Sequence, residues 1–312
     1  MENFFTVARQ VFVLFALIGA GALMRKRGLI NEAAASGIVN VLIIAVTPCL
    51  IIEVFQRPFN AAMLRELGIA FIIAFCAHIA IIIASSLMWR RKDDSSCVLR
   101  LATVFSNAGF MGIPLEQAIF GDIGVFYGIT YVATFNFIIW SWGLAVMKKR
   151  SGDGTMASNW KIMVLNPGTV GLSTGLALFI LRIKLPGMIA TPISMMASMN
   201  TPLAMIAIGY YLAGANLGAV MRSYSAYVAS LARLVIYPLA LVAALYPLRG
   251  ILEREMMLAL VTAASAPVAA MVAMFSAKFD RDTDLAVGLV SGTTLLSMLT
   301  MPAAIAIAMA VL

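Results

Sequence analysis

Ten long apolar runs separated by short polar gaps constrain this chain more than any other feature of its sequence. A helix needs about 20 apolar residues to cross a hydrocarbon core roughly 30 Å thick. The runs lie at 5–24, 33–55, 65–89, 97–120, 124–147, 164–183, 186–213, 223–247, 254–277 and 284–311. We therefore predict an all-α integral membrane protein of ten transmembrane helices. Because no gap is long enough to hold a further domain, we expect the function inside the bundle.

Composition supports a lipid environment. The chain is 62% hydrophobic and 12% charged, whereas a soluble domain carries about 25% charged residues. The formal net charge of +8 does not indicate nucleic acid, because the basic residues cluster in the gaps, where membrane topology places them. We expect the lipid bilayer as a partner and no nucleic acid. Cys49, Cys76 and Cys97 lack metal-ligand spacing, so we expect neither a metal nor a cofactor.

The distribution of basic residues predicts the orientation. Gaps after odd-numbered runs hold fourteen Lys and Arg residues, and gaps after even-numbered runs hold six. Positive residues concentrate on the cytoplasmic side, so we expect both termini outside the cytoplasm. The N-terminus lacks the basic region and cleavage site of a removable signal, so we expect the first run to be a permanent helix.

Two internal matches predict a repeat. The longest cytoplasmic gap divides the chain into 1–150 and 151–312, with five runs each, so the halves enter the membrane from opposite faces. Thr47-Pro48 recurs as Thr201-Pro202, 154 residues later, and the stretch from Asn107 recurs from Ser265, 158 residues later. The two spacings are nearly equal, which favours an inverted repeat of the kind found in transporters.

The fourth and ninth runs are expected to be interrupted helices. Gly109, Gly112 and Pro114 weaken the fourth, and Ser265 with Pro267 weakens the ninth. Non-helical backbone inside a membrane is tolerated where it lines a cavity, and a half-helix that starts there directs free N–H groups at an anion. The alternative, a simple kink in each helix, is less consistent with two breaks at equivalent positions. The candidate substrate-binding residues are Asn107, Ser106, Gly109, Gly112, Pro114, Thr47, Pro48, Asn200, Thr201, Ser265, Pro267 and Asn136.

Four ionisable residues inside the runs are candidates for a charge or proton role, because such groups are costly in lipid. Arg233 is either a counter-charge for an anion or a packing residue paired with Glu53, Glu116 or a carbonyl group. Glu116 either takes up a proton or faces an outer vestibule, and Glu53 is expected in a wet position. His78 is either a hydrogen-bonded packing residue or a proton carrier. Asn136, Asn200 and Thr201 either bind a carboxylate or bond across helices.

The stretch from Asn107 to Leu115 resembles the crossover motif of the auxin efflux carrier family, whose bacterial members include permeases for malonate and related organic acids. Weaker matches follow along the chain, at Gly21–Gly28, Thr47-Pro48, Asn166-Pro167, Pro202, Ile208-Gly209, Arg233 and Pro238. The resemblance implies two inverted five-helix repeats, similar to bile-acid sodium symporters. It also implies a scaffold of helices 1, 2, 6 and 7 that often dimerises, and a transport domain of helices 3–5 and 8–10. Asn107 would contact substrate there. The long central loop of the plant carriers is missing, which favours a bacterial inner-membrane protein and disfavours auxin.

We therefore expect a secondary transporter that carries a small organic anion, such as malonate, by alternating access, with coupling to protons or sodium left open. An ion channel and a sodium-coupled transporter of another solute are the alternatives. An intramembrane enzyme would need a reactive motif such as HExxH. This motif requires two histidines, and the chain has one.

Overall fold

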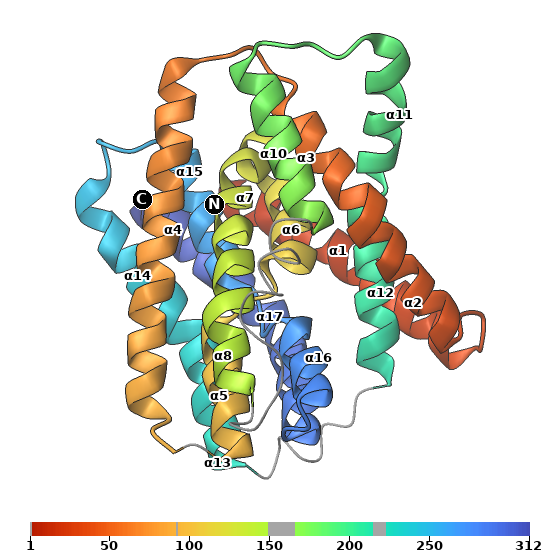
Figure 1. Ribbon diagram of the computed structural model, residues 1–312, viewed down its shortest axis with the longest axis vertical. Coiled ribbons are helices and arrows are strands. Elements are labelled where there is room, and N and C mark those ends of the chain that lie inside the picture. Colours follow the sequence, from red (N-terminus) through yellow and green to blue (C-terminus); the bar gives the residue numbers. More distant parts are fainter. Residues whose placement is uncertain (1, 92, 149–165, 215–222) are drawn as a thin grey trace.

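In the computed structural model, helices account for nearly all regular structure (Figure 1). The structure describes the whole chain except residues 1, 92, 149–165 and 215–222, and the described residues form no strand beyond isolated bridges. The first half consists of α1 (Glu2–Lys26), α2 (Glu32–Val41), η1 (Leu42–Val46), α3 (Thr47–Phe55), α4 (Ala61–Met88), α5 (Asp94–Val104), η2 (Ala108–Gly112), α6 (Ile113–Phe120), α7 (Asp122–Ile138), η3 (Ile139–Gly143) and α8 (Leu144–Met147). The second half consists of α10 (Pro167–Ile180), α11 (Gly187–Ser198), α12 (Asn200–Ala213), α13 (Tyr224–Leu231), η6 (Ala232–Ile236), α14 (Tyr237–Leu245), η7 (Tyr246–Leu248), α15 (Arg254–Ser265), α16 (Ala270–Lys278) and α17 (Thr283–Val311).

Five helical segments are long and apolar enough to cross a membrane: Glu32–Phe55, Ala61–Met88, Asp122–Met147, Tyr224–Leu248 and Thr283–Val311. Each agrees with an expected run to within a few residues, because hydropathy alone determines where such a helix begins and ends. The all-helical membrane fold is therefore confirmed. The expected division between residues 150 and 151 lies outside the described residues, as do the basic residues Lys149, Arg150, Lys161 and Arg222.

Side-chain caps begin several helices at the polar gaps. Asn31, Asn60 and Asp93 accept hydrogen bonds from backbone N–H groups two or three residues ahead, at 2.8, 2.8 and 2.7 Å. Each cap satisfies a donor that the first helical turn leaves free. The hydrogen bonds from Ser96 to the exposed Asp93 carboxyl hold the pKa of that group below its usual value.

The two interruptions are real, but the first is not at its proline. The fourth run leaves helical geometry at Phe105–Asn107, and the chain then winds through η2 and α6 past Pro114. Our expectation that Pro114 prevents a continuous helix at that point was wrong. The ninth run is interrupted at Ala266–Ala269, which contains Pro267 itself.

Wide π-helical turns explain how the chain winds past Pro114. Pro48, Pro114 and Pro238 are each the second residue of an α-helix that directly follows a π-helix. Proline cannot donate to the carbonyl one turn back, and its ring clashes with that carbonyl in a regular α-helix. A π-turn inserts one extra residue, so the ring follows a wider turn. The helix therefore continues, and the interruption lies seven residues before Pro114.

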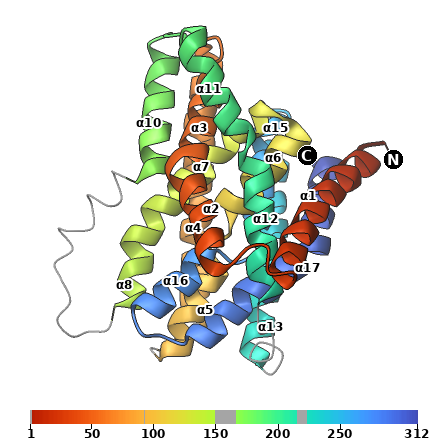
Figure 2. The same ribbon diagram turned by 90° about the vertical axis from the view of Figure 1, so that its right-hand side faces the viewer.

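The helices pack as two groups. Helix α1 runs along α12, while α10 and α11 pack on α3. In the other group α7 packs on α4, α6 and α15, and α17 packs on α15, α16 and α5. Figure 2 shows α10, α3 and α11 rising together on one side of the molecule, with α16, α5 and α13 at the opposite end. The groups meet where α1 and α12 contact α6 and α17, and also where α3 and α10 contact α7.

The connecting segments gather at two opposite ends. At one end Arg281 forms an ion pair with Asp94 at 2.5 Å and donates to the Met147 carbonyl at 2.9 Å, which joins the segments that follow α4, α8 and α16. At the other end, the Leu185 N–H group donates to Gln56 at 2.8 Å. The ends of odd-numbered runs thus lie together, as alternating spans require.

Candidate functional site

The two interruptions cross each other directly. Ser106 pairs with Val268 in an isolated antiparallel bridge. The Asn107 N–H group donates to the Pro267 carbonyl at 2.6 Å, and the Ala269 N–H group donates to the Phe105 carbonyl at 2.9 Å. Unpaired backbone groups are costly away from water, so two segments that both leave helical geometry stabilise each other by pairing. We call Phe105–Asn107 and Ala266–Ala269 together the crossing.

Arg233 donates hydrogen bonds to the carboxyl ends of both helices that precede the interruptions. This side chain is completely buried on η6. Its guanidinium donates to the carbonyls of Thr103 and Val104 at 3.4 and 3.0 Å, in the last turn of α5, and to the carbonyl of Ala264 near the end of α15. A cation stabilises the negative end of a helix dipole, and here one cation serves two helices. Within the described chain its bonded partners are these carbonyls and neither Glu53 nor Glu116.

Beyond the crossing, η2 begins without a side-chain cap among the described residues. The Asn107 carbonyl accepts from Met111 and Gly112 at 3.0 and 3.3 Å, but the Asn107 side chain does not cap the helix. The first N–H groups of a helix have no partner within the helix. Around Gly109 there is open space, since a Cβ atom added there would touch nothing within 4 Å. An uncapped helical turn of this kind is where an anion can accept hydrogen bonds from backbone N–H groups.

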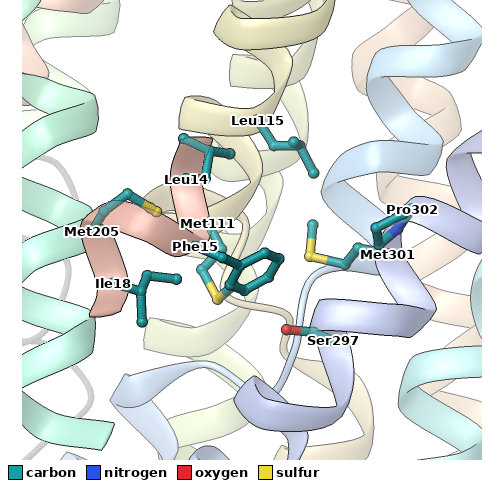
Figure 3. Close-up of a pocket in the computed structure, with 9 residues that line it drawn as sticks. All are labelled: Leu14, Phe15, Ile18, Met111, Leu115, Met205, Ser297, Met301 and Pro302. Atoms are coloured by element: carbon teal, nitrogen blue, oxygen red, sulfur yellow. The ribbon is translucent and has the colours of Figure 1, made fainter. Parts of the chain in front are cut away.

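A small apolar cavity lies between the two groups of helices (Figure 3). It has a volume of about 20 Å³, enough for roughly one water molecule. The side chains of Phe15, Met111 and Met301 converge on it. The lining residues are Leu14, Phe15, Ile18, Met111, Leu115, Met205, Ser297, Met301 and Pro302. They come from α1 and α12 on one side and from η2, α6 and α17 on the other, so the groups are closed on each other here.

Comparison with known proteins identifies the family. A family model described as membrane transport protein matches residues 6–305. An uncharacterized transporter of Methanothermobacter thermautotrophicus is 27% identical over 297 residues, which cover 94% of this chain and 95% of that protein. The chain belongs to the auxin efflux carrier family. The resemblance in its sequence is thereby confirmed, and the chain is a multi-pass membrane transporter rather than an enzyme.

Several expected site residues of this transporter lie at or beside the crossing. Ser106 and Asn107 are buried in it, and the Ser106 hydroxyl has no hydrogen-bond partner among the described residues. Ser265 is buried at the end of α15 and donates to the Thr262 carbonyl at 2.8 Å. A Cβ atom on Gly112 would lie 3.4 Å from the Ala263 Cα atom, so this glycine lets η2 and α15 approach closely.

Other expected residues lie elsewhere. Thr47 donates to the Asn200 side chain at 3.3 Å, which joins α3 to α12 next to Pro48 and Thr201. Asn136 on α7 lies beside Gly168 at the start of α10. The bond between Thr47 and Asn200 corresponds to one of the two alternatives left open for Asn200, a hydrogen bond across helices.

Two of the remaining ionisable candidates have contrasting surroundings. Glu53 on α3 is half-buried. His78 on α4 is completely buried, donates to the Ala74 carbonyl at 2.8 Å and lies 4.5 Å from the Tyr131 ring between centroids. The Nε2 atom of His78 and the Tyr131 hydroxyl have no hydrogen-bond partner within the described part of the chain. His78 therefore has a hydrogen bond typical of a packing residue and one unused ring nitrogen.

Sequence reasoning missed Thr293 and the apolar cavity. The Thr293 hydroxyl accepts from the Val268 N–H group at 3.1 Å and so anchors the second interruption to α17. Nothing in the sequence distinguishes Thr293 from other threonines in apolar runs. For the cavity a signal did exist, because Met111 and Leu115 are four residues apart and therefore share a helix face. Among the described residues no three His, Cys, Asp or Glu side chains gather as a metal site.

Proposed function

We propose that this transporter moves a small organic anion, such as malonate or a related carboxylate, by alternating access, with the anion bound at the crossing. The observation that carries the proposal is the mutual pairing of the two interruptions directly before the first turn of η2, which has no side-chain cap. Backbone donors at a helix N-terminus bind carboxylates without a cationic side chain. The burial of Arg233 beneath the carbonyls of Thr103, Val104 and Ala264 favours a positioning role over direct contact with the anion.

The proposal includes a specific architecture. Ten spans would form two inverted repeats, residues 1–150 and 151–312. A scaffold of α1, α2–α3, α10 and α11–α12 would face a transport domain made of the other helices. The packing of α1 on α12 and of α10 and α11 on α3 supports this grouping. The matching positions of Pro48 and Pro202, near the starts of α3 and α12, support the repeat.

Alternating access requires the two groups to separate. The cavity between them holds about one water molecule, so an anion reaches the crossing only when η2, α6 and α17 move relative to α1 and α12. The apolar lining suits a moving surface, because thioether and aliphatic side chains slide without breaking hydrogen bonds. We further propose a bacterial inner-membrane location, termini outside the cytoplasm and a homodimer formed by the scaffold.

Counterflow in liposomes tests the proposal. Purified protein should exchange external labelled malonate for internal malonate with saturable kinetics. Replacement of Asn107 by alanine should lower the exchange rate at low malonate by roughly tenfold to a hundredfold, the effect of losing a hydrogen bond to a charged ligand.

Asn40→Ala is the matched control, because Asn40 is an exposed asparagine on α2, away from the crossing. Its exchange should equal that of the unaltered protein. If Asn107→Ala exchanges malonate as fast as this control, the anion is not bound at the crossing. Current that grows without saturation would instead indicate a channel.

A further inference from the structure

Glu116 is a buried acid without a partner. It lies on α6, is completely buried, and neither of its carboxyl oxygens has a hydrogen-bond partner among the described residues. Glu66 on α4 provides a contrast, because its carboxylate accepts from the Tyr127 hydroxyl at 2.6 Å. Such an unsatisfied group in a packed interior calls for a functional explanation.

The space that holds this carboxyl group is created by a glycine. A Cβ atom added to Gly128 on α7 would overlap the Glu116 carboxyl group. A Cβ atom on Gly112 would lie 3.8 Å from the Glu116 Oε1 atom. Side chains on a helix lean toward its N-terminus, so the carboxyl group is directed back toward η2 and the crossing. The Glu116 carboxyl group therefore packs against Gly128 of α7 and lies near Gly112 of η2.

The ionisable residues on the elements around α6 leave Glu116 without a charge partner. Within the described part of the chain none of them is bonded to its carboxyl group. They are Asp122, Tyr127 and Tyr131 on α7, Arg254 and Glu255 on α15, Arg9, Arg25 and Lys26 on α1, and Tyr210 and Tyr211 on α12. An ionised carboxylate that is buried without a partner costs far more free energy than the neutral acid. In this closed conformation the group therefore holds a proton.

We infer that Glu116 is the proton carrier of this transporter, and that one proton moves together with each anion. The inference rests on the proposed function. When the two groups of helices separate, water reaches the Glu116 carboxyl group, its O–H bond breaks, and the proton passes to that water. Closure over a bound anion requires the carboxylate to take a proton back, because two negative charges would otherwise be buried together. The carrier that returns without an anion leaves this proton behind, so one proton crosses with each anion. Glu116 thus couples the movement of the bundle to a proton.

Charge repulsion determines the direction of coupling. Asn107 and Glu116 are nine positions apart, and the Glu116 side chain leans back by about one turn, so its carboxylate would lie roughly 8–10 Å from an anion bound at Asn107. At an effective dielectric constant of about 20, an ionised Glu116 would weaken anion binding roughly tenfold. Anion binding therefore favours the protonated acid. Proton and anion travel in the same direction.

The experiment combines transport with infrared spectroscopy of Glu116→Gln, which keeps the shape of the side chain but has no proton that it can release or take up near neutral pH. A pH gradient, acidic outside, should drive accumulation of labelled malonate in liposomes that contain the unaltered protein. Glu116→Gln should lose this accumulation at least tenfold yet retain malonate counterflow, which needs no net proton movement. Glu66→Gln is the matched control and should retain both. Accumulation by Glu116→Gln equal to that of the control would overturn the inference.

Infrared spectra of the purified protein separate this inference from the proposed function. At neutral pH the carbonyl band of a protonated carboxyl group should be present in the unaltered protein and in Glu66→Gln, and absent from Glu116→Gln. If malonate is not transported at all, the proposed function fails while this band still decides the protonation of Glu116. If the carbonyl band of a protonated carboxyl group is absent from the unaltered protein, the inference is wrong. Should Glu116→Gln not fold, Glu116→Asp replaces it, and an unshifted band would then count against Glu116.

Discussion

The two interrupted helices differ in how they are held. After Phe105–Asn107 the chain enters a π-helix, the Ser106 hydroxyl has no partner in the described structure, and Gly109 faces open space. Around Ala266–Ala269, by contrast, the Val268 N–H group is bonded to Thr293 on α17. The second interruption is anchored and the first is left open. We infer that the first interruption adapts to the ligand while the second provides a fixed support.

Arg233 donates hydrogen bonds to the helix that precedes each interruption, and its loss should have the largest effect. Arg233→Met leaves the carbonyl groups of Thr103, Val104 and Ala264 without their donor in a buried site. We expect the free energy of unfolding to fall by about 3 kcal/mol or more. Thermal unfolding in detergent measures this, with Arg57→Met as control because Arg57 stacks over Phe126 at the molecular end. Equal unfolding temperatures for the two variants would show that the carboxyl ends of α5 and α15 do not need a cation for stability.

Removal of the anchor tests the second interruption alone. Thr293→Val keeps the shape of the side chain but leaves the Val268 N–H group buried without an acceptor. We expect a loss of about 1–3 kcal/mol of stability. Thr294→Val is the matched control, since Thr294 donates only to its own helix, at the Val290 carbonyl. If both variants unfold at the same temperature, the two interruptions are held alike and the contrast between them disappears.

The smallest effects are expected at the prolines. Pro114→Ala should leave the first interruption intact, because that interruption lies before η2, and Pro267→Ala should leave the Pro267 carbonyl in place. Each variant should change the free energy of unfolding by less than about 1 kcal/mol, mainly through the unfolded chain. A disulfide between cysteines placed at Ser106 and Val268, with the native cysteines changed to alanine, should form equally in both. Failure of this cross-link in Pro114→Ala would restore the proline as the cause of the interruption.

Much of the fold follows from local sequence. Apolar length placed the spans at Glu32–Phe55, Ala61–Met88 and Thr283–Val311 to within a few residues, because each helix satisfies its own backbone hydrogen bonds in lipid. The motif from Asn107 to Leu115 was sufficient to suggest the family. The sequence also gives the proline positions. It does not predict whether the helix at each proline continues through a π-turn or is interrupted, because both arrangements place a proline in an apolar run.

The sequence by itself determined the membrane class, five of the ten expected spans and the two weak helices, since hydropathy and backbone chemistry act over one or two turns. Only the tertiary structure decided what those weak points contact. Arg233 reaches carbonyls about 130 and 31 residues away, Val268 finds Thr293, and Glu116 occupies the space left by Gly128. These partners are brought together by packing across the bundle, and buried polar groups accept whichever donor or acceptor the packing supplies. No local pattern encodes that choice.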